Sequence, residues 1–213
     1  MDACASGVIP NARISLVISN RKAAYGLTRA SNADPPIPTD YLALQPFLKS
    51  SPGKTRADYD LQIARMVMQF GQPDLVVLAG WLHILSQEFL EVLNGERGIP
   101  AASSTSISMR VSKPTPIINL HPALPGAFDG ADAIKRAYAA FQKGEITGTG
   151  AMVHRVVKEV DAGAPIIVQE IPIEADDTIE ALEERLHAVE HKIIVEATRK
   201  ILEETDMDLE KYF

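Results

Sequence analysis

A chain of 213 residues is long enough to bury one substantial hydrophobic core, and we expect residues 1–213 to form a single domain. Its hydrophobic fraction of 46%, charged fraction of 23% and formal net charge of −7 are those of an ordinary globular protein, and the negative charge argues against nonspecific binding to nucleic acid or to anionic membranes. Cys4 is the single cysteine, which argues against a disulfide framework and a cysteine-based zinc site. No apolar run approaches the ~20 residues of a membrane span, which argues against a membrane anchor. Together these features predict a cytoplasmic protein.

The first half of the chain predicts helices that alternate with short strands. Residues 1–7 have the pattern of a helix end with a glycine stop. In chain order we then expect a strand at 13–19, a helix at 22–31, a weaker strand at 39–44, a helix at 56–70, a buried strand at 74–80, and a helix capped by Ser86 that continues to about Leu93. Residues 98–116 are rich in Ala, Ser, Thr and Pro without periodicity, and they predict a flexible surface insertion.

Residues 117–125, IINLHPALP, combine a buried strand with two side chains suited to carbonyl chemistry. Asn119 and His121 have the same parity on this strand, so both side chains should emerge from one face. Ligands of open α/β sheets bind at the carboxyl ends of strands. An amide there can donate to an oxygen that gains negative charge, and an imidazole can exchange a proton near neutral pH. The alternative is structural, with an asparagine that caps a turn and a histidine bonded to a carbonyl.

The last third of the chain predicts a helix at 131–143, strands at 147–157 and 164–173, and a long final helix. The two strands are joined so closely that we expect them to pair antiparallel, with Asp161 at the tip of their connection. Asp177 and Glu180 resemble a capping box, and apolar residues at helical spacing across 179–201 predict a buried stripe. The whole pattern predicts an α/β fold: a mostly parallel, helix-covered sheet with an antiparallel C-terminal strand pair and a long C-terminal helix.

The remaining histidines carry less information. His187 and His191 have the i, i+4 spacing that zinc sites use, but no glutamate directly follows His187, so a solvated or substrate-facing helix edge is favoured over a metal site. His154 alternates with apolar residues on a strand, and we expect it to be structural unless a ligand reaches it. The sequence contains no G-x-G-x-x-G, Walker A or G-x-S-x-G motif, so dinucleotide-binding, P-loop and serine hydrolase functions are unsupported.

Four segments together resemble a known enzyme family. They are DLVVLAGWLHILS (74–86), INLHPALPG (118–126), GTGAMVHRVVKEVDAGAPIIVQE (148–170) and LHAVEHKI (186–193). In this order, and with N-x-H-P followed by Asp-x-Gly, they are similar to the phosphoribosylglycinamide formyltransferases of the formyltransferase superfamily over nearly the whole chain. The Glu-His pair of the last helix favours this family over methionyl-tRNA formyltransferases and formyltetrahydrofolate deformylases. The resemblance implies a Rossmann-like formyltransferase fold and the transfer of a formyl group from 10-formyltetrahydrofolate to the amine of glycinamide ribonucleotide, in purine synthesis.

The resemblance also implies roles for particular residues. The catalytic groups would be Asn119, His121 and Asp161: Asp161 would favour the protonated imidazole, and Asn119 and protonated His121 would stabilise the oxyanion. The folate-binding positions would be Arg56, Leu82, His83, Ile84, Leu85, Val156, Val157 and Val160. The substrate-binding positions would be Pro122, His187 and Glu190, the last two at the phosphate and ribose. The nucleophile would be the amine of the substrate itself, so neither a nucleophilic side chain nor a metal is expected.

The sequence departs from the family pattern at three points. His83 stands where many members carry arginine, and His187 stands where lysine or glutamine is usual. The family opens with a strand and a G-x-G-S-N loop whose backbone N–H groups hold the substrate phosphate. This sequence begins where the following helix would end, so we expect a truncated chain that binds its substrate weakly until the missing segment is restored.

Two alternatives stay open at this point: another folate-dependent formyltransferase or deformylase, and a catalytically weak folate-binding module. The expected partners are the two small-molecule substrates, with no nucleic acid and no membrane, and the expected oligomeric state is a monomer or a homodimer.

Overall fold

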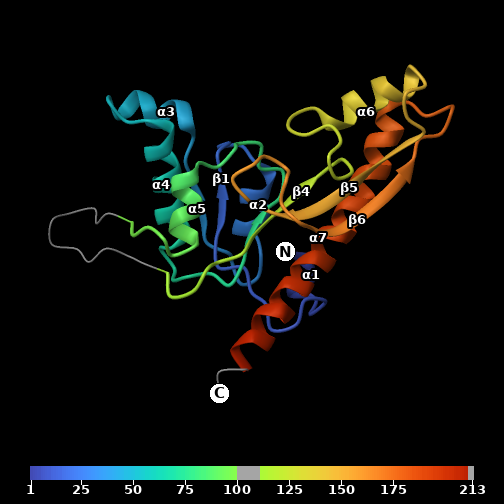
Figure 1. Cartoon of the computed structure of the whole chain (residues 1–213). Helices are drawn as coiled ribbons and strands as arrows, with labels where there is room; N and C mark the ends of the chain where they lie inside the picture. Colours follow the sequence, from blue (N-terminus) through green and yellow to red (C-terminus); the bar gives the residue numbers. More distant parts are fainter. Residues whose placement is uncertain (100–110, 211–213) are drawn as a thin grey trace, which may run out of the picture. The chain divides into compact units, whose positions relative to one another are not determined.

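The computed structural model describes residues 1–99 and 111–210, and its contacts divide the chain into two compact units (Figure 1). The first unit comprises Met1–Asp74 and Leu85–Thr115, and the second comprises Leu75–Ile84 and Pro116–Phe213. Both units contain helices and strands, which confirms the α/β class. The expectation of a single domain stays a prediction. Within the described residues, no helix combines the length and the apolar composition that a membrane crossing requires.

The first unit contains five helices and one parallel pair of short strands in its described residues. In chain order these are α1 (Asp2–Ala5), β1 (Val17–Ser19), α2 (Tyr25–Ser31), β2 (Thr39–Tyr41), α3 (Leu44–Ser50), α4 (Arg56–Val67) and α5 (Gln87–Leu93). Only three residues of each strand are paired, so both strands are shorter than the expected ranges 13–19 and 39–44. The sequence did not predict α3, which contains Pro46. This proline lies in the first turn, where backbone N–H groups have no partner within the helix, so it is tolerated there.

A buried carboxylate joins α4 to the start of α5. Asp60 is fully buried, and its Oδ2 accepts a hydrogen bond of 2.8 Å from the backbone N–H of Ser86. The Ser86 hydroxyl in turn accepts from the N–H of Phe89, which confirms the predicted helix cap.

The segment expected to be a flexible insertion, 98–116, is described only in part. Residues 100–110 lie outside the described residues. After them, the Ser112 N–H donates to Gln72 Oε1 at 2.8 Å, and Gln72 Nε2 donates to the Lys113 carbonyl at 2.6 Å. Thr115 is 2% exposed. The chain is therefore anchored to the first unit before it enters the next strand.

The second unit is built on one four-stranded sheet. Its elements are β3 (Val76–Leu78), β4 (Ile117–His121), α6 (Ala133–Gln142), β5 (Gly148–Arg155), β6 (Pro165–Pro172) and α7 (Ile179–Glu210). The strand order is β3-β4-β5-β6, with β3 and β4 parallel and the other neighbours antiparallel. The antiparallel β5–β6 pair is confirmed. The antiparallel β4–β5 pair was not predicted, because the periodicity of a strand does not identify its neighbour.

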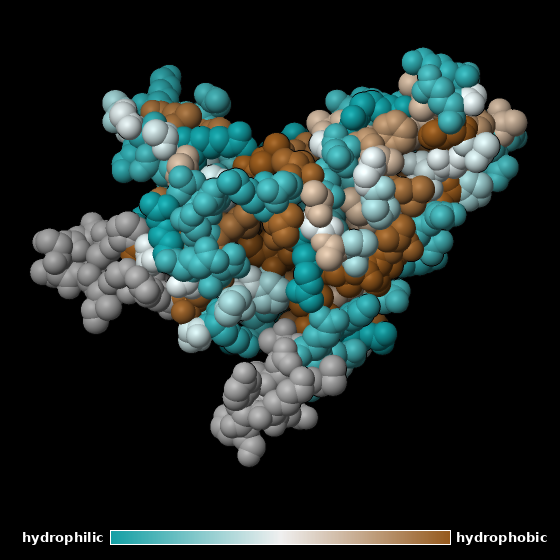
Figure 2. Space-filling model, viewed as in Figure 1, coloured by the Kyte–Doolittle hydropathy of each residue, from teal (hydrophilic) through white to brown (hydrophobic). Residues whose placement is uncertain are grey.

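The long helix α7 covers one face of this sheet, where it packs against β5 and β6 (Figure 1). The predicted apolar stripe is confirmed, and its buried members are Leu182, Leu186, Ile193, Ala197 and Ile201. β6 is the edge strand, and Figure 2 shows apolar surface (brown) between hydrophilic patches in the region of β6 and α7.

The predicted capping box at the start of α7 is wrong. The hydroxyl of Thr178 accepts from the Ala181 N–H at 3.2 Å and caps the helix. Asp177 instead accepts from the Glu174 N–H at 2.8 Å and forms an ion pair with Arg185. Both residues are typical N-caps, so the sequence pattern alone could not separate them.

Candidate active site

β4 divides its side chains between the core and the opposite face of the sheet. Ile118 is fully buried in the cluster that α7 covers, and Leu120 packs against the same cluster. Because side chains alternate along a strand, Asn119 and His121 lie on the other face, in agreement with their parity in the sequence. His121 is 4% exposed, so its imidazole lies in a largely water-free environment.

β5 places a third polar side chain on this face. Asn119 is paired with His154, and cross-strand partners lie side by side on one face of a sheet. The Nδ2 atom of Asn119 lies 3.2 Å from Nε2 of His154, whose Nδ1 lies 2.9 Å from the carbonyl oxygen of Arg155. A carbonyl can only accept, so Nδ1 carries the proton of neutral His154 and Nε2 accepts a hydrogen bond from the Asn119 amide.

The connection from β5 to β6 folds closely against the end of β5. Asp161 has a positive φ of 54°, a strained value for a residue with a side chain. Gly163 lies so close to β5 that an added Cβ would be 1.6 Å from the carbonyl oxygen of Arg155. No other residue type fits at Gly163 without a shift of the backbone, which gives the Asp-x-Gly pattern a structural cause.

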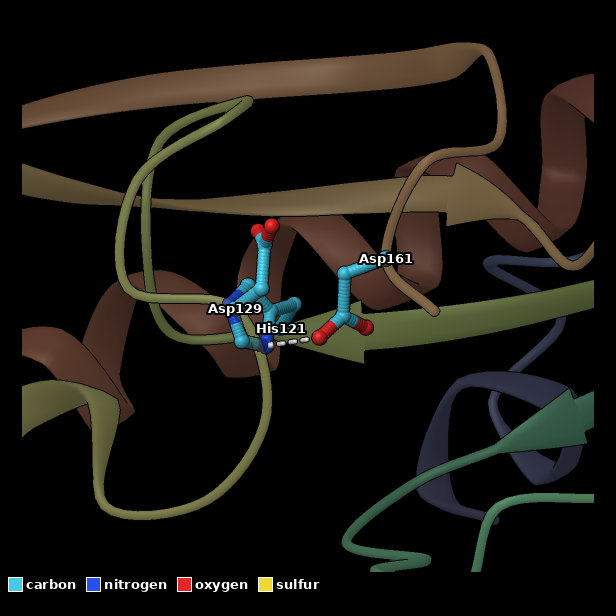
Figure 3. Close-up of side chains that lie close together, drawn as sticks. All are labelled: His121, Asp129 and Asp161. Atoms are coloured by element: carbon cyan, nitrogen blue, oxygen red, sulfur yellow. Dashed lines mark ion pairs between the residues drawn. The ribbon is translucent and has the colours of Figure 1, made fainter. Parts of the chain in front are cut away.

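This connection brings the Asp161 carboxylate to all three side chains on the sheet. Its Oδ1 lies 3.4 Å from His154 Nε2 and 3.5 Å from Asn119 Nδ2. Its Oδ2 lies 3.6 Å from His121 Nδ1 (Figure 3). The Asp161 side chain is 8% exposed, and Oδ2 also accepts a 2.8 Å hydrogen bond from the N–H of Gly130. The three predicted catalytic residues therefore lie together, and His154 joins them.

The electrostatic environment of His121 favours the neutral imidazole. Burial has the largest effect on the pKa of His121 and lowers it, and the nearby His154 lowers it further. The carboxylates of Asp161 and Asp129 act in the opposite direction and raise this pKa. Because Asp161 faces Nδ1, the proton of the neutral ring is best placed on Nδ1. The Phe128 carbonyl also favours the charged ring, although the buried Nε2 has no hydrogen bond of normal geometry with any described residue. A buried nitrogen without a partner is costly, and here it can receive a group of the substrate.

The same residues belong to a set that could hold a metal ion. A ring nitrogen of His121 and carboxylate oxygens of Asp129 and Asp161 all lie within 4.8 Å of one another (Figure 3). One imidazole and two carboxylates are suitable ligands for a divalent cation. The sequence predicted no metal, and that expectation stays a prediction.

Four of the expected folate-binding residues form exposed apolar surface on the second unit. Leu82, Ile84, Val157 and Val160 are 75%, 52%, 42% and 40% exposed. Large apolar side chains gathered in two short exposed segments are typical of a binding surface. Between Leu82 and Ile84, the ring of His83 lies 6.2 Å from that of Trp81 in an edge-to-face arrangement.

The other expected folate-binding residues have different surroundings. Val156 is half-buried, and its N–H donates to the Ile117 carbonyl at 2.8 Å. Arg56 is exposed at the first position of α4, and Leu85 is buried; both belong to the first unit. For these two residues the folate-binding role stays a prediction.

The expected substrate-binding residues lie directly after β4 and on α7. Pro122 is half-buried directly after β4. His187 is exposed, and its Nε2 lies 3.8 Å from Oε2 of Glu190. Burial raises the pKa of Glu190, and the two neighbouring histidines oppose that shift. A groove along this part of α7 is lined by Glu180, Glu183, Glu184, His187, Ala188 and His191. Its three carboxylates disfavour a phosphate at His187.

Sequence reasoning missed two residues of this cluster. His154 has the parity of Met152 on its strand, but its place beside Asn119 depends on the β4–β5 register, which the sequence did not reveal. Asp129 follows β4 in a loop where an acidic residue is ordinary, and its approach to His121 depends on the path of that loop.

Comparison with known proteins gives one consistent family. The family described as Formyl transferase matches residues 1–97 and 107–198 of the chain. The chain is 48% identical over 204 residues to a phosphoribosylglycinamide formyltransferase of Schizosaccharomyces pombe, which covers 95% of this chain and 89% of that protein. It is 44% identical over 191 residues to the enzyme of that name from Dictyostelium discoideum, covering 89% of this chain and 84% of that protein.

Solved structures give the same result. Glycinamide ribonucleotide transformylase 1 from Geobacillus kaustophilus matches with a TM-score of 0.73 at 30% identity, over 94% of this chain and 89% of that one. The corresponding enzyme from Symbiobacterium toebii matches with a TM-score of 0.72 at 31% identity, over 93% and 77%. The chain therefore belongs to the formyl transferase family.

Proposed function

We propose that this chain transfers the formyl group of 10-formyltetrahydrofolate to the amine of glycinamide ribonucleotide, a step of purine biosynthesis. The observation that carries the proposal is the buried imidazole of His121, whose Nδ1 faces the Asp161 carboxylate and whose Nε2 has no hydrogen bond of normal geometry with a described residue. The amide of Asn119 stands on the same face of the sheet. Acyl transfer requires a donor for the oxyanion and a base for the proton of the nucleophile. The Asn119 amide can be that donor, and the His121 imidazole, oriented by the Asp161 carboxylate, can be that base.

The first half of the reaction joins the substrate amine to the formyl carbon. The amine nitrogen forms a bond to that carbon, and the carbonyl electron pair moves onto oxygen to give an oxyanion. The neutral imidazole of His121 takes the proton that the amine loses, and the Asp161 carboxylate stabilises the resulting imidazolium. The sequence had led us to expect an imidazole already protonated; the lowered pKa of His121 favours this order instead. The Asn119 amide donates to the oxyanion.

The second half releases the folate. The oxyanion re-forms the carbonyl bond, the bond from carbon to the folate N10 breaks, and the imidazolium returns its proton to that nitrogen. The products are the formylated amine and tetrahydrofolate, and the site is returned to its starting protonation state. The exposed apolar residues at 82–84 and 157–160 offer a surface on which the flat ring system of the folate could pack.

The proposal is tested with Asn119→Ala and His121→Ala, assayed with both substrates at saturation and checked by circular dichroism. Removal of one donor of this kind lowers kcat by about 10²–10³-fold, and we expect at least that loss in each variant with an unchanged spectrum. Lys135→Ala, an exposed position on α6, is the control and should keep full activity. Near-normal turnover in both site variants would overturn the proposal.

A parallel assay without the ribonucleotide separates this function from hydrolysis of the formyl donor. We expect tetrahydrofolate to form only when glycinamide ribonucleotide is present. Steady release of formate from the donor alone would identify a deformylase in place of a transferase.

A further inference from the structure

The loop between β4 and α6 is bonded to the carboxylate that orients His121. The backbone N–H of Gly130 donates to Oδ2 of Asp161 at 2.8 Å, and the same oxygen lies 3.6 Å from Nδ1 of His121 (Figure 3). The bond to Gly130 is shorter than the contacts of this carboxylate with side chains of the sheet, which are 3.4–3.6 Å long. The place of the carboxylate beside the imidazole therefore depends on where the loop holds the N–H of Gly130.

The loop does not adopt this path by local preference alone. Phe128, two residues before Gly130, has a φ of 54°, which is strained for a residue with a side chain. Asp161 itself has a φ of 54° at the other end of the hydrogen bond. Such conformations persist only where contacts with the surroundings fix them.

One side chain, Arg136 in the first turn of α6, makes such contacts. Its Nη2 donates to the carbonyl oxygens of Phe128 and Asp129, the latter at 2.6 Å. Its guanidinium carbon lies 5.9 Å from the centroid of the Phe128 ring. The carbonyl of Asp129 and the N–H of Gly130 belong to the same planar peptide group. Arg136 therefore holds one end of the peptide group whose other end donates to Asp161.

We propose that Arg136 is a positioning residue for formyl transfer, which fixes the Asp161 carboxylate at His121 through the peptide group between Asp129 and Gly130. A hydrogen bond to the carbonyl of a peptide group also polarises its N–H, so Arg136 strengthens the bond to Asp161 as well as directing it. This role rests on the proposed function, because the orientation of His121 matters only if this imidazole takes the proton of the substrate amine.

The kinetic test uses Arg136→Met, which keeps the aliphatic part of the side chain and removes both hydrogen bonds. With both substrates at saturation we expect kcat to fall about tenfold, because the carboxylate loses its fixed place. The KM of each substrate should stay within about twofold, because the proposed binding residues are unchanged. Arg136→Lys, which keeps a donor for the two carbonyls, should recover kcat to within about threefold of the unchanged chain. Lys135→Met, which removes the neighbouring exposed cation on α6, is the matched control and should leave kcat unchanged.

A second measurement follows the link itself and requires no turnover. Amide hydrogen exchange, read by NMR of the free protein, reports the hydrogen bond of the Gly130 N–H. In Arg136→Met this proton should exchange at least about tenfold faster than in the unchanged chain. Arg136→Lys should restore slow exchange, and Lys135→Met should leave the rate unchanged. Circular dichroism checks that every variant is folded at the temperature of the assays.

The outcomes separate this role from the function on which it rests. If His121→Ala is inactive, an unchanged kcat in Arg136→Met overturns the role of Arg136 alone, whether or not the exchange at Gly130 changes. A fall in kcat without faster exchange at Gly130 also overturns it, because the effect would not pass through this peptide group. Full activity of His121→Ala would overturn the proposed function and this role with it.

Discussion

The side-chain amide of Asn119 has two N–H donors, and both have acceptors within the protein. One donates to His154 Nε2 at 3.2 Å, and the other reaches Asp161 Oδ1 at 3.5 Å, the limit for a hydrogen bond. The longer contact is the weaker one, so an oxyanion can replace it at little cost. His154 then acts on the reaction through Asn119: it fixes the plane of the amide and leaves the second N–H directed into the site.

At the scale of this residue we predict that His154→Phe, which keeps the ring and removes both nitrogens, lowers kcat by up to about 10²-fold, because the amide loses its orientation. The KM for the folate should change little. The Arg155 carbonyl also loses its donor, which should cost about 1–3 kcal/mol in the free energy of unfolding. Steady-state kinetics and urea unfolding measure the two effects. His154→Gln, which offers an acceptor, should recover part of kcat; an equal loss in both variants would contradict the positioning role.

At the scale of the element, the first residue of a helix could be predicted where a single capping residue precedes the helix. It could not be predicted where two residues that commonly cap helices are neighbours in the sequence, as Asp177 and Thr178 are before α7. Ser86 is the one capping residue before α5 and occupies the cap as expected. At α4 the capping box is complete: the Thr55 hydroxyl accepts from the Asp58 N–H, and Asp58 Oδ2 accepts from the Thr55 N–H at 2.8 Å. The Thr55 backbone hydrogen bond, followed by the contact with Lys54, lowers the pKa of Asp58 to about 2.

This depressed pKa predicts a dependence of stability on pH. The pKa of Asp58 in the folded chain lies below the unfolded value of 3.8, so its stabilising effect is complete above that value and is lost as the pH falls through about 2. The free energy of unfolding of Asp58→Asn should therefore lie below that of the unchanged chain at pH 7, and the difference should shrink between pH 4 and pH 2. Urea unfolding at several pH values checks this. A difference that is constant down to pH 2 would show that the carboxylate is not what caps the helix.

At the scale of the whole molecule, the features that could be predicted from the sequence are those that depend on local periodicity. The alternation of IINLH placed Asn119 and His121 on one face, and the apolar stripe of the last helix identified the side that packs on the sheet. What could not be predicted depends on contacts between distant residues. The β4–β5 register puts His154 beside Asn119, and the folded loop after β4 puts Asp129 near His121. The resemblance to a family supplied Asp161, which local periodicity alone leaves as an ordinary turn residue.

The hydrophobic core of the second unit contains residues of the two strands that carry the site, which leads to a last prediction. Ile118 and Val153 belong to the two strands that carry Asn119 and His154, and both are buried in one cluster with Leu186 of α7. Leu186→Ala removes a fully buried side chain, so it should lower the free energy of unfolding by about 2–5 kcal/mol. In a protein of this size that corresponds to a fall of roughly 4–20 °C in Tm.

Far below the new Tm, kcat per folded molecule should stay within about twofold, because no group that touches the substrate has changed. Calorimetry and kinetics at 15 °C measure the two effects, with Glu196→Ala, exposed on the same helix, as the control that should change neither. A large loss of kcat at a temperature where the variant is fully folded would show that this core sets the positions of the catalytic side chains as well as the stability of the unit.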